Sequence, residues 1–247
     1  DKENILTKFK LKKGPNFTDY SRIKEFVVRK DIKCVSINDD SYPVHLKNIY
    51  DPPFLLYIKG NTKALSNISV SVVGTRKPTN NGSIESFKLS MNLGKHGISV
   101  VSGLALGIDS ASHWGNIYGG GETIAVLGNS IDSIYPKENV TLAQELLSNN
   151  GVIISEFPPF TGIKKYNFPK RNRIIAGLTR DLVIIQAPKK SGSLITGDFA
   201  LENGADLYVH SIGVSDPRFL GSNNYYNQGA TKIDTAQPIL KKYGETY

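Results

Sequence analysis

Cysteine is almost absent from this 247-residue sequence, in which Cys34 is the only one. A lone cysteine excludes an intrachain disulfide and leaves too few thiolates for a cysteine-based metal cluster. The four histidines show no H-x-x-x-H spacing, so we expect no bound metal. No apolar run approaches the roughly 20 residues that cross a bilayer, and the polar, lysine-rich N-terminus does not resemble a signal peptide. These absences predict a metal-free, cytoplasmic protein.

Two nucleotide-binding signatures are also missing. No G-x-x-x-x-G-K-[ST] motif occurs, which argues against ATP hydrolysis through a P-loop. No G-x-G-x-x-G motif follows the first apolar run, which argues against a dinucleotide cofactor. We therefore expect no cofactor.

Positive charge is in excess, and it is unevenly distributed. The formal net charge is +8. Residues 1–33 contain ten Lys and Arg against five Asp and Glu, a net of +5, which leaves +3 for the remainder. Such a balance favours a polyanionic partner, but a solvated lysine-rich arm is an equal alternative. Basicity alone does not decide between them.

Short apolar runs alternate with amphipathic stretches from residue 68 onward. The runs predict strands at 68–73, 98–101, 123–127, 152–155, 182–185 and 207–209. The amphipathic stretches predict helices at 83–95, 108–117, 139–149, 171–178 and 194–203. Apolar strands separated by helices are buried on both faces of a sheet. The pattern predicts an α/β fold: an extended Rossmann-like, doubly wound, mostly parallel sheet with helices on both faces.

Two regions flank this pattern. Residues 1–38 are predicted to form a short basic N-terminal module, with Ile23, Phe26 and Val27 at helical spacing, and residues 39–247 the Rossmann-like domain. The tail is expected to be loop-rich, with a closing helix at 238–243.

Candidate binding residues leave the predicted strands at their C-terminal ends, where open parallel sheets bind ligands. Glycine lets the backbone approach a phosphate closely, and a helix N-terminus offers free N–H donors to it. The segment Ser191-Gly192-Ser193 best fits such a cradle, and an ordinary helix N-cap is an equal interpretation. The candidates are Gly74, Thr75, Arg76, Ser102, Gly103, Lys137, Ser191, Gly192, Ser193 and Thr196.

The segment 164–173 holds five cations and two aromatic residues within ten positions. Cations can follow a phosphate backbone while aromatic rings stack on unpaired bases, although most charge runs are solvated loops. We expect Arg171 to share one groove with Arg76, and Glu156 to orient Arg171 or Arg173. The candidates from this segment are Lys165, Phe168, Lys170, Arg171, Asn172 and Arg173.

Ordered motifs between residues 42 and 233 point to one known family. They include Tyr42-Pro43, Val72-Val73-Gly74-Thr75-Arg76, Ser102-Gly103-Leu104-Ala105, Tyr135-Pro136-Lys137-Glu138-Asn139, Phe168-Pro169-Lys170-Arg171-Asn172-Arg173 and Ser191-Gly192-Ser193-Leu194-Ile195-Thr196. In this order and spacing the sequence resembles the DNA-processing protein A (DprA/Smf) family.

The resemblance implies a homodimer that binds single-stranded DNA in a positively charged pocket and helps to load the RecA recombinase during natural transformation, without covalent chemistry. By motif, Arg76, Arg171 and Arg173 correspond to phosphate-binding cations, with Lys137 and Lys170 in support. Leu106 stands where the family usually has arginine, so one expected cation is absent. Gln186 replaces a common glutamate. We expect no winged-helix segment after the domain and only a partial form of the usual N-terminal helical domain.

Two other functions stay open. The lysine-decarboxylase-like Rossmann enzymes hydrolyse nucleoside monophosphates, with an acidic residue in the loop that corresponds to 191–196, and this chain lacks that residue. A sensor that binds a mononucleotide is the other alternative. Asp109 and His113 lie one helical turn apart, but we expect Asp109 to cap its helix or bond a neighbouring loop rather than to act as an acid or base. We therefore predict a binding protein and not an enzyme.

Overall fold

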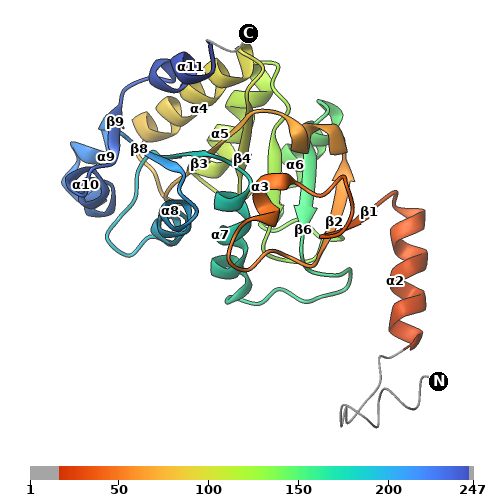
Figure 1. Cartoon of the computed structure of the whole chain (residues 1–247). Helices are drawn as coiled ribbons and strands as arrows, with labels where there is room; N and C mark the ends of the chain where they lie inside the picture. The colour runs from red at the N-terminus through yellow and green to blue at the C-terminus, as the bar shows by residue number, and fades with distance from the viewer. Residues whose placement is uncertain (1–16, 245–247) are drawn as a thin grey trace.

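A nine-stranded sheet forms the centre of the molecule in the computed structural model, which describes residues 17–244 and the side chains from residue 21 onward (Figure 1). The strand order is β1-β2-β6-β5-β4-β3-β7-β8-β9. The strands are β1 (Lys33–Ser36), β2 (Leu55–Gly60), β3 (Ser69–Val73), β4 (Ser99–Ser102), β5 (Ile124–Leu127), β6 (Val152–Ser155), β7 (Asp181–Ile184), β8 (Asp206–His210) and β9 (Thr231–Ile233). Strands β3 to β9 are parallel, whereas β2 pairs antiparallel with β6 and β1 antiparallel with β2.

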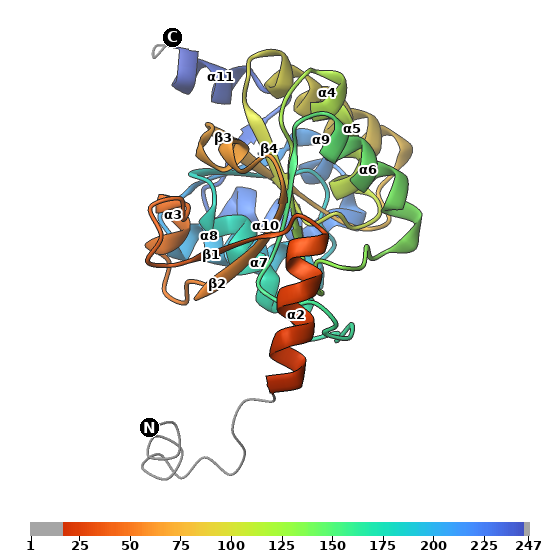
Figure 2. The ribbon, with the colours of Figure 1, turned by 90° about the vertical axis from the view of Figure 1, so that its right-hand side faces the viewer.

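Helices cover both faces of this sheet. They are α2 (Phe17–Arg29), α3 (Val44–Lys47), α4 (Asn80–Lys95), α5 (Ile108–Tyr118), α6 (Val140–Ser148), α7 (Asn167–Gly177), α8 (Gly192–Glu202), α9 (Ser211–Val214), α10 (Leu220–Asn227) and α11 (Gln237–Gly244), with 3-10 turns η1 (Thr62–Ser66), η2 (Lys137–Asn139) and η3 (Pro217–Phe219). One face packs against α4, α5, α6 and α11, and the other against α3, α7 and α8 (Figure 2). The predicted α/β, Rossmann-like, mostly parallel architecture is confirmed.

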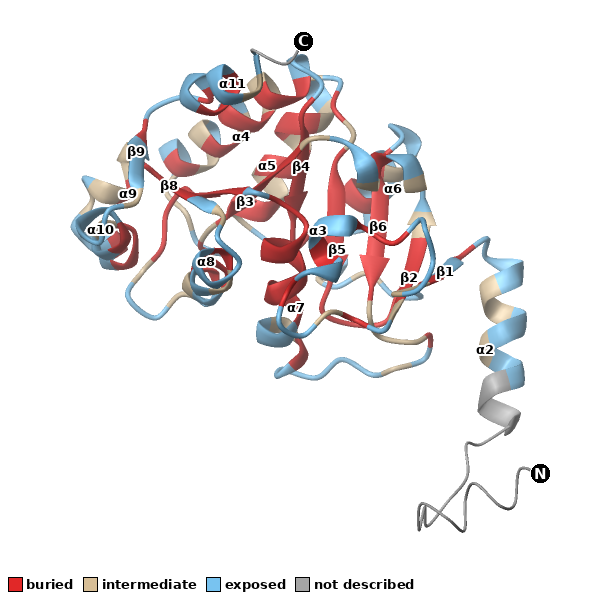
Figure 3. Cartoon of the chain, in the orientation of Figure 1, coloured by how far each residue is buried: buried red, intermediate tan, exposed pale blue. Residues whose placement is uncertain are grey.

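The central strands are buried along their whole length, as the continuous apolar runs predict (Figure 3). Side chains of β3, β4 and β7 alternate between two hydrophobic clusters on opposite faces of the sheet, and those of β5 and β6 alternate between the first of these clusters and a third. The strand order reverses at β3, which has β4 on one side and β7 on the other. In open α/β sheets this reversal opens a crevice at the C-terminal ends of the strands.

Several predicted elements need correction. The helix predicted at 171–178 begins four residues earlier, so much of the basic segment is helical rather than a loop. The tail is not loop-rich, because it contains α10, β9 and α11. Cys34, a residue type that is usually buried, is exposed on the edge strand β1. Residues 33–36 contribute this strand to the sheet, and the domain division at residue 38 stays a prediction.

Helix α4 buries small residues beside the two large apolar residues Leu89 and Leu93. Ile84 is exposed, whereas Ser86 and Ser90 are fully buried against α5. A Cβ at Gly115 of α5 would collide with the backbone carbonyl of Phe87. The two helices therefore approach so closely that only small side chains fit between them. No helix in the stretch 17–244 has the length and apolar character that a membrane span requires.

Candidate nucleic-acid interface

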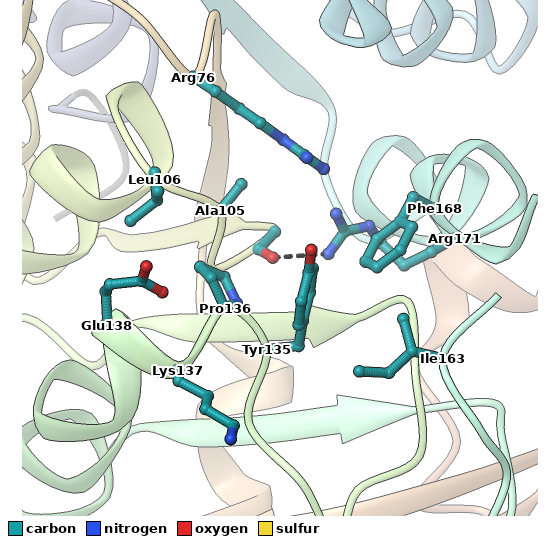
Figure 4. Close-up of a pocket in the computed structure, with 11 residues that line it drawn as sticks. Arg76, Ala105, Leu106, Tyr135, Pro136, Lys137, Glu138, Ile163, Phe168 and Arg171 are labelled. Carbon is teal, nitrogen blue, oxygen red and sulfur yellow. Dashed lines mark hydrogen bonds between the residues drawn. The ribbon is translucent and has the colours of Figure 1, made fainter. Parts of the chain in front are cut away.

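A pocket of about 450 Å³ lies at the C-terminal edge of the sheet (Figure 4). Its walls come from the segments that follow β3, β4, β5 and β6, together with the first turns of α7. The lining residues are Arg76, Gly103, Ala105, Leu106, Tyr135, Pro136, Lys137, Glu138, Ile163, Phe168 and Arg171. Parallel strands bring their C-terminal ends to one edge, which is why residues up to 95 positions apart meet here.

Cations and aromatic rings alternate around the rim of this pocket. The Arg76 guanidinium carbon lies 5.6 Å from the centroid of the Phe168 ring, within the range of a cation–π contact. The Phe168 ring lies 5.6 Å from that of Tyr135, at an interplanar angle of 43°. Arg76, Tyr135 and Lys137 are exposed, so they are available to a ligand. Arg76 and Arg171 line the same pocket, as the sequence predicts.

Arg171 forms part of the pocket floor. Its side chain is 4% exposed, and Nη1 donates hydrogen bonds to the carbonyls of Gly103, at 2.7 Å, and Val126. These carbonyls follow β4 and end β5, so the guanidinium ties two strand ends together. Burial lowers the pKa of Arg171 to about 10, with Asp109 opposing the shift and Arg76 adding to it, so the group stays charged at neutral pH. A Cβ at Gly103 would approach this guanidinium to 2.5 Å, which explains the glycine there.

Asp109 organises the loop after β4. Its buried Oδ2 accepts the backbone N–H of Gly103 at 3.2 Å and that of Ala105 at 3.3 Å. Burial raises the pKa of Asp109, and the nearby Arg171 charge opposes this rise. The predicted bond between Asp109 and a neighbouring loop is confirmed. Because the carboxylate is fully engaged beneath the loop, it positions the pocket wall rather than a reacting group.

His113 is buried beside this pair and is held in one tautomer. Thr123 Oγ1 donates its only proton to the carbonyl of Val100, so His113 Nδ1, at 2.6 Å, must donate to that same oxygen. His113 Nε2 is left without a hydrogen-bond partner within the described part of the chain. Burial, helped by the Arg171 charge, lowers the pKa of His113 to about 3. The ring is therefore neutral in the folded protein.

This buried histidine predicts a loss of stability in acid. The unfolded chain binds a proton on His113 near its ordinary pKa of 6.5, whereas the folded chain does so only near 3, so the free energy of unfolding decreases as the pH falls through this window. We expect this group to remove about 2 kcal/mol between about pH 7 and pH 5. The contribution of His113 is isolated by urea titrations of the protein and of His113→Asn at both pH values. The asparagine keeps an N–H donor near Thr123 but does not titrate in this range. An equal pH dependence in both proteins would contradict it.

Arg173 is not brought to the pocket, although the sequence predicts it as a phosphate contact. Its Nη2 lies 2.7 Å from Glu156 Oε2 and its Nε 2.9 Å from Asp51 Oδ2. The predicted pairing of Glu156 with one of the two arginines is therefore confirmed for Arg173. Lys170 lies 3.6 Å from the same Glu156 carboxylate and is half exposed. The Arg173 guanidinium donates to the Asp51 and Glu156 carboxylates and to the carbonyl of Lys170, so it fastens α7 to the segment before β2 and to the segment after β6 instead of lining the pocket.

Of the predicted site residues, five line the pocket, namely Arg76, Gly103, Lys137, Phe168 and Arg171. The others lie outside its lining, namely Gly74, Thr75, Ser102, Lys165, Lys170, Asn172, Arg173, Ser191, Gly192, Ser193 and Thr196. Ser102 is buried and donates to the carbonyl of Val72, which makes it part of the sheet. Ser191 caps α8 by accepting the N–H of Ser193, which corresponds to the ordinary N-cap interpretation.

Tyr135 is an aromatic pocket residue that was not among the predicted site residues, although it belongs to one of the family motifs. It follows β5 and lies two positions before Lys137, so the same pairing of aromatic and cation that marks 164–173 also marks this loop. Leu106 is 40% exposed on the opposite wall, where an arginine was expected from the family resemblance. An apolar side chain therefore occupies that wall.

Comparison with known proteins identifies the family. The sequence model of the family described as DNA recombination-mediator protein A matches residues 33–244. The chain belongs to this family. It is 39% identical to the DNA processing protein DprA of Bacillus subtilis over 215 residues, which cover 87% of this chain and 72% of that protein. It is also 39% identical to DprA of Streptococcus pneumoniae over 208 residues, 84% of this chain and 73% of that protein.

Solved structures of family members have the same fold. The crystal structure of Streptococcus pneumoniae DprA matches with a TM-score of 0.81 at 37% identity, covering 88% of this chain and 77% of that one. Helicobacter pylori DprA, described in its single-stranded DNA binding mode, matches with a TM-score of 0.78 at 30% identity, covering 88% and 99%. The molybdenum cofactor carrier protein of Chlamydomonas reinhardtii, at 16% identity and a TM-score of 0.52, shares the fold alone. The predicted resemblance to DprA/Smf is confirmed.

Proposed function

We propose that this protein is a recombination mediator that binds single-stranded DNA at the pocket between β3, β4, β5 and α7. The observation that carries the proposal is the meeting of Arg76, Lys137, Tyr135 and Phe168 at one rim from three separate segments. Exposed cations attract the phosphate backbone, and aromatic rings stack on bases of any identity. Family membership supports the same function.

The residues divide into contacts and supports. Arg76 and Lys137 bind phosphates, and Phe168 and Tyr135 stack on bases. Lys165 and Lys170 add positive charge beside the pocket, while Gly74, Thr75 and Asn172 shape its surroundings, Ser102 fixes the end of β4, and the segment 191–196 forms the start of α8. Arg171 supplies positive charge from the pocket floor, where Nη1 donates to two carbonyls and Nε to Asn172 Oδ1. A RecA-type recombinase, a second copy of this chain in a homodimer, and a cytoplasmic role in transformation follow from family membership as part of this proposal.

The enzymatic alternative has less support from the pocket. Hydrolysis of a nucleoside monophosphate needs a positioned acid or base. Among the described residues that line the pocket, Glu138 is the one carboxylate, and it is exposed. Asp109 is engaged by backbone N–H groups, and the segment 191–196 lies outside the lining. We therefore propose a binding protein without catalytic activity.

A titration of fluorescent oligonucleotides tests the proposal. Single-stranded DNA, duplex DNA and a nucleoside monophosphate are compared at two salt concentrations. We expect the single strand to bind most tightly, with log affinity falling against log salt by about 0.7 for each phosphate contacted. Tighter binding of the monophosphate, or release of free base from it, would overturn the proposal.

A further inference from the structure

Helix α2 carries a cluster of arginine and phenylalanine side chains that the pocket does not include. Arg22, Phe26 and Arg29 lie at helical spacing on one side of α2 and meet Phe160 from the segment between β6 and α7, and we call these four residues the α2 cluster. The Arg22 guanidinium carbon lies 4.0 Å from the centroid of the Phe160 ring. The Phe26 and Phe160 rings meet edge to face at 5.0 Å, and Arg29 lies 5.9 Å from the Phe26 ring.

Phe160 is held in an unusual backbone conformation. Its φ is +67°, a left-handed value that bulky side chains rarely adopt. Its backbone N–H donates to Asp132 Oδ1 at 3.2 Å, and Phe26 packs against the ring. The ring is nevertheless 40% exposed. Strain of this kind persists where surrounding contacts enforce it and is frequent at binding sites.

The same segment connects the α2 cluster to the pocket. Ile163, which lines the pocket, follows Phe160 by three residues, a length of chain that spans at most about 11 Å. Lys164, Lys165 and Tyr166 come next and are all exposed, with the Lys164 ammonium 5.7 Å from the Tyr166 ring. Figure 2 shows this segment beside α2 at the lower edge of the molecule. Cations and aromatic rings therefore follow one another from the pocket to α2.

Docking of α2 onto the domain explains the position of Phe26 but not the two arginines of the α2 cluster. Phe26 packs against the hydrophobic cluster around β5 and α6, which fastens α2 to the domain. Arg22 and Arg29 are exposed, and no ion pair between described residues includes either of them. Their recorded contacts are the faces of the two phenylalanine rings. Fastening a helix does not require two solvent-facing guanidinium groups on that surface.

We propose that the α2 cluster is a second subsite for the same single strand. A strand that leaves the pocket passes over residues 164–166 and reaches α2, where a base stacks on Phe160 and phosphates contact Arg22 and Arg29. Exposed rings between cations are the composition with which proteins bind single strands without regard to sequence. This inference rests on the proposed function, because it extends the path of the strand bound in the pocket.

The experiment compares oligonucleotides of two lengths, about six and about twenty nucleotides, within the range of single-strand site sizes. The variant R22Q/R29Q removes both cations of the α2 cluster. We expect it to weaken binding of the longer strand about tenfold and to decrease its salt slope by about 1.4, because two phosphate contacts are lost. Binding of the shorter strand, which the pocket accommodates, is expected to stay within about twofold.

Two further variants are needed. One tests stacking separately from charge, and the other tests whether the loss of any two surface cations has the same effect. Phe160→Leu keeps the side chain apolar and removes the ring, so we expect about fivefold weaker binding of the longer strand with an unchanged salt slope. The control K95Q/K241Q removes two exposed cations, from the C-terminal end of α4 and from α11, and is expected to change neither quantity. Thermal melts of each variant check that α2 stays docked and the domain folded.

The outcomes distinguish the two proposals. If the unmodified protein binds neither oligonucleotide, the proposed function fails. If it binds both lengths equally, or if R22Q/R29Q keeps the affinity and salt slope for the longer strand, the pocket alone binds DNA and the α2 cluster is not a subsite. An equal loss in K95Q/K241Q would also overturn the inference, because general charge would then explain the effect.

Discussion

Replacement of Arg76 by Ala is expected to weaken binding of single-stranded DNA about ten- to a hundredfold, to a similar extent for every base sequence. A hydrogen bond to a charged group contributes about 1.5–3 kcal/mol, which corresponds to this range. Arg76 is exposed, and its recorded contact is with the face of the Phe168 ring, so its removal leaves the fold intact. The slope of log affinity against log salt is expected to decrease by about 0.7, as for the loss of one phosphate contact.

The neighbouring Lys77 provides the matched control. Lys77 is also exposed, but it does not line the pocket. Lys77→Ala is expected to change the affinity less than Arg76→Ala and to leave the salt slope almost unchanged. Fluorescence anisotropy at four salt concentrations measures both quantities. A salt slope in Arg76→Ala equal to that of the unmodified protein would remove Arg76 from the phosphate contacts.

Replacement of Arg171 by Met is expected to reduce the free energy of unfolding by about 3–5 kcal/mol, the usual effect of removing one partner of a buried charge pair. The carbonyls of Gly103 and Val126 lose their donor, and Asp109 loses the positive charge that opposes its desolvation. Without that charge the pKa of Asp109 rises further. The folded state then retains a proton that the unfolded state releases above about pH 4, so stability decreases as the pH rises from there.

A double variant and a surface control test this explanation. Arg171→Met with Asp109→Asn removes the buried negative charge as well, and we expect it to recover part of the lost stability and to flatten its pH dependence. Lys170→Met, on the same helix but half exposed, is expected to change the free energy of unfolding by less than about 1 kcal/mol. Urea titrations measure all four proteins. An Arg171→Met protein as stable as the unmodified one would show that the guanidinium does not hold the strand ends.

The sequence predicts most of the sheet because a strand that is buried on both faces appears as a continuous apolar run. The strand predicted at 152–155 coincides with β6, and the loops after β3 and β4 do supply pocket residues. The start of α7 is harder to predict, because Pro169 and a run of cations are more typical of a loop than of a helix. Proline is tolerated in the first turn of a helix, where its missing N–H has no carbonyl partner to lose.

Roles that depend on distant partners could not be predicted. In the sequence, Arg171 and Arg173 both look like free cations of a basic segment. Only the fold shows that Arg171 is buried in the pocket floor and that Arg173 pairs with Asp51, 122 positions away. The buried side of α4 is only partly visible as large apolar residues for a related reason. Serine and glycine stand beside Leu89 and Leu93 on that side because α5 lies so close.

The buried position of Arg171 has a consequence for how a bound polymer behaves. The Arg171 guanidinium is 4% exposed and Nη1 is engaged by two carbonyls, so most of its effect on a polyanion comes from its electric field, and a field imposes no preferred register. A strand resting on such a floor shifts by one nucleotide with little change in its electrostatic attraction to that charge. The protein can then hold the strand and still slide along it.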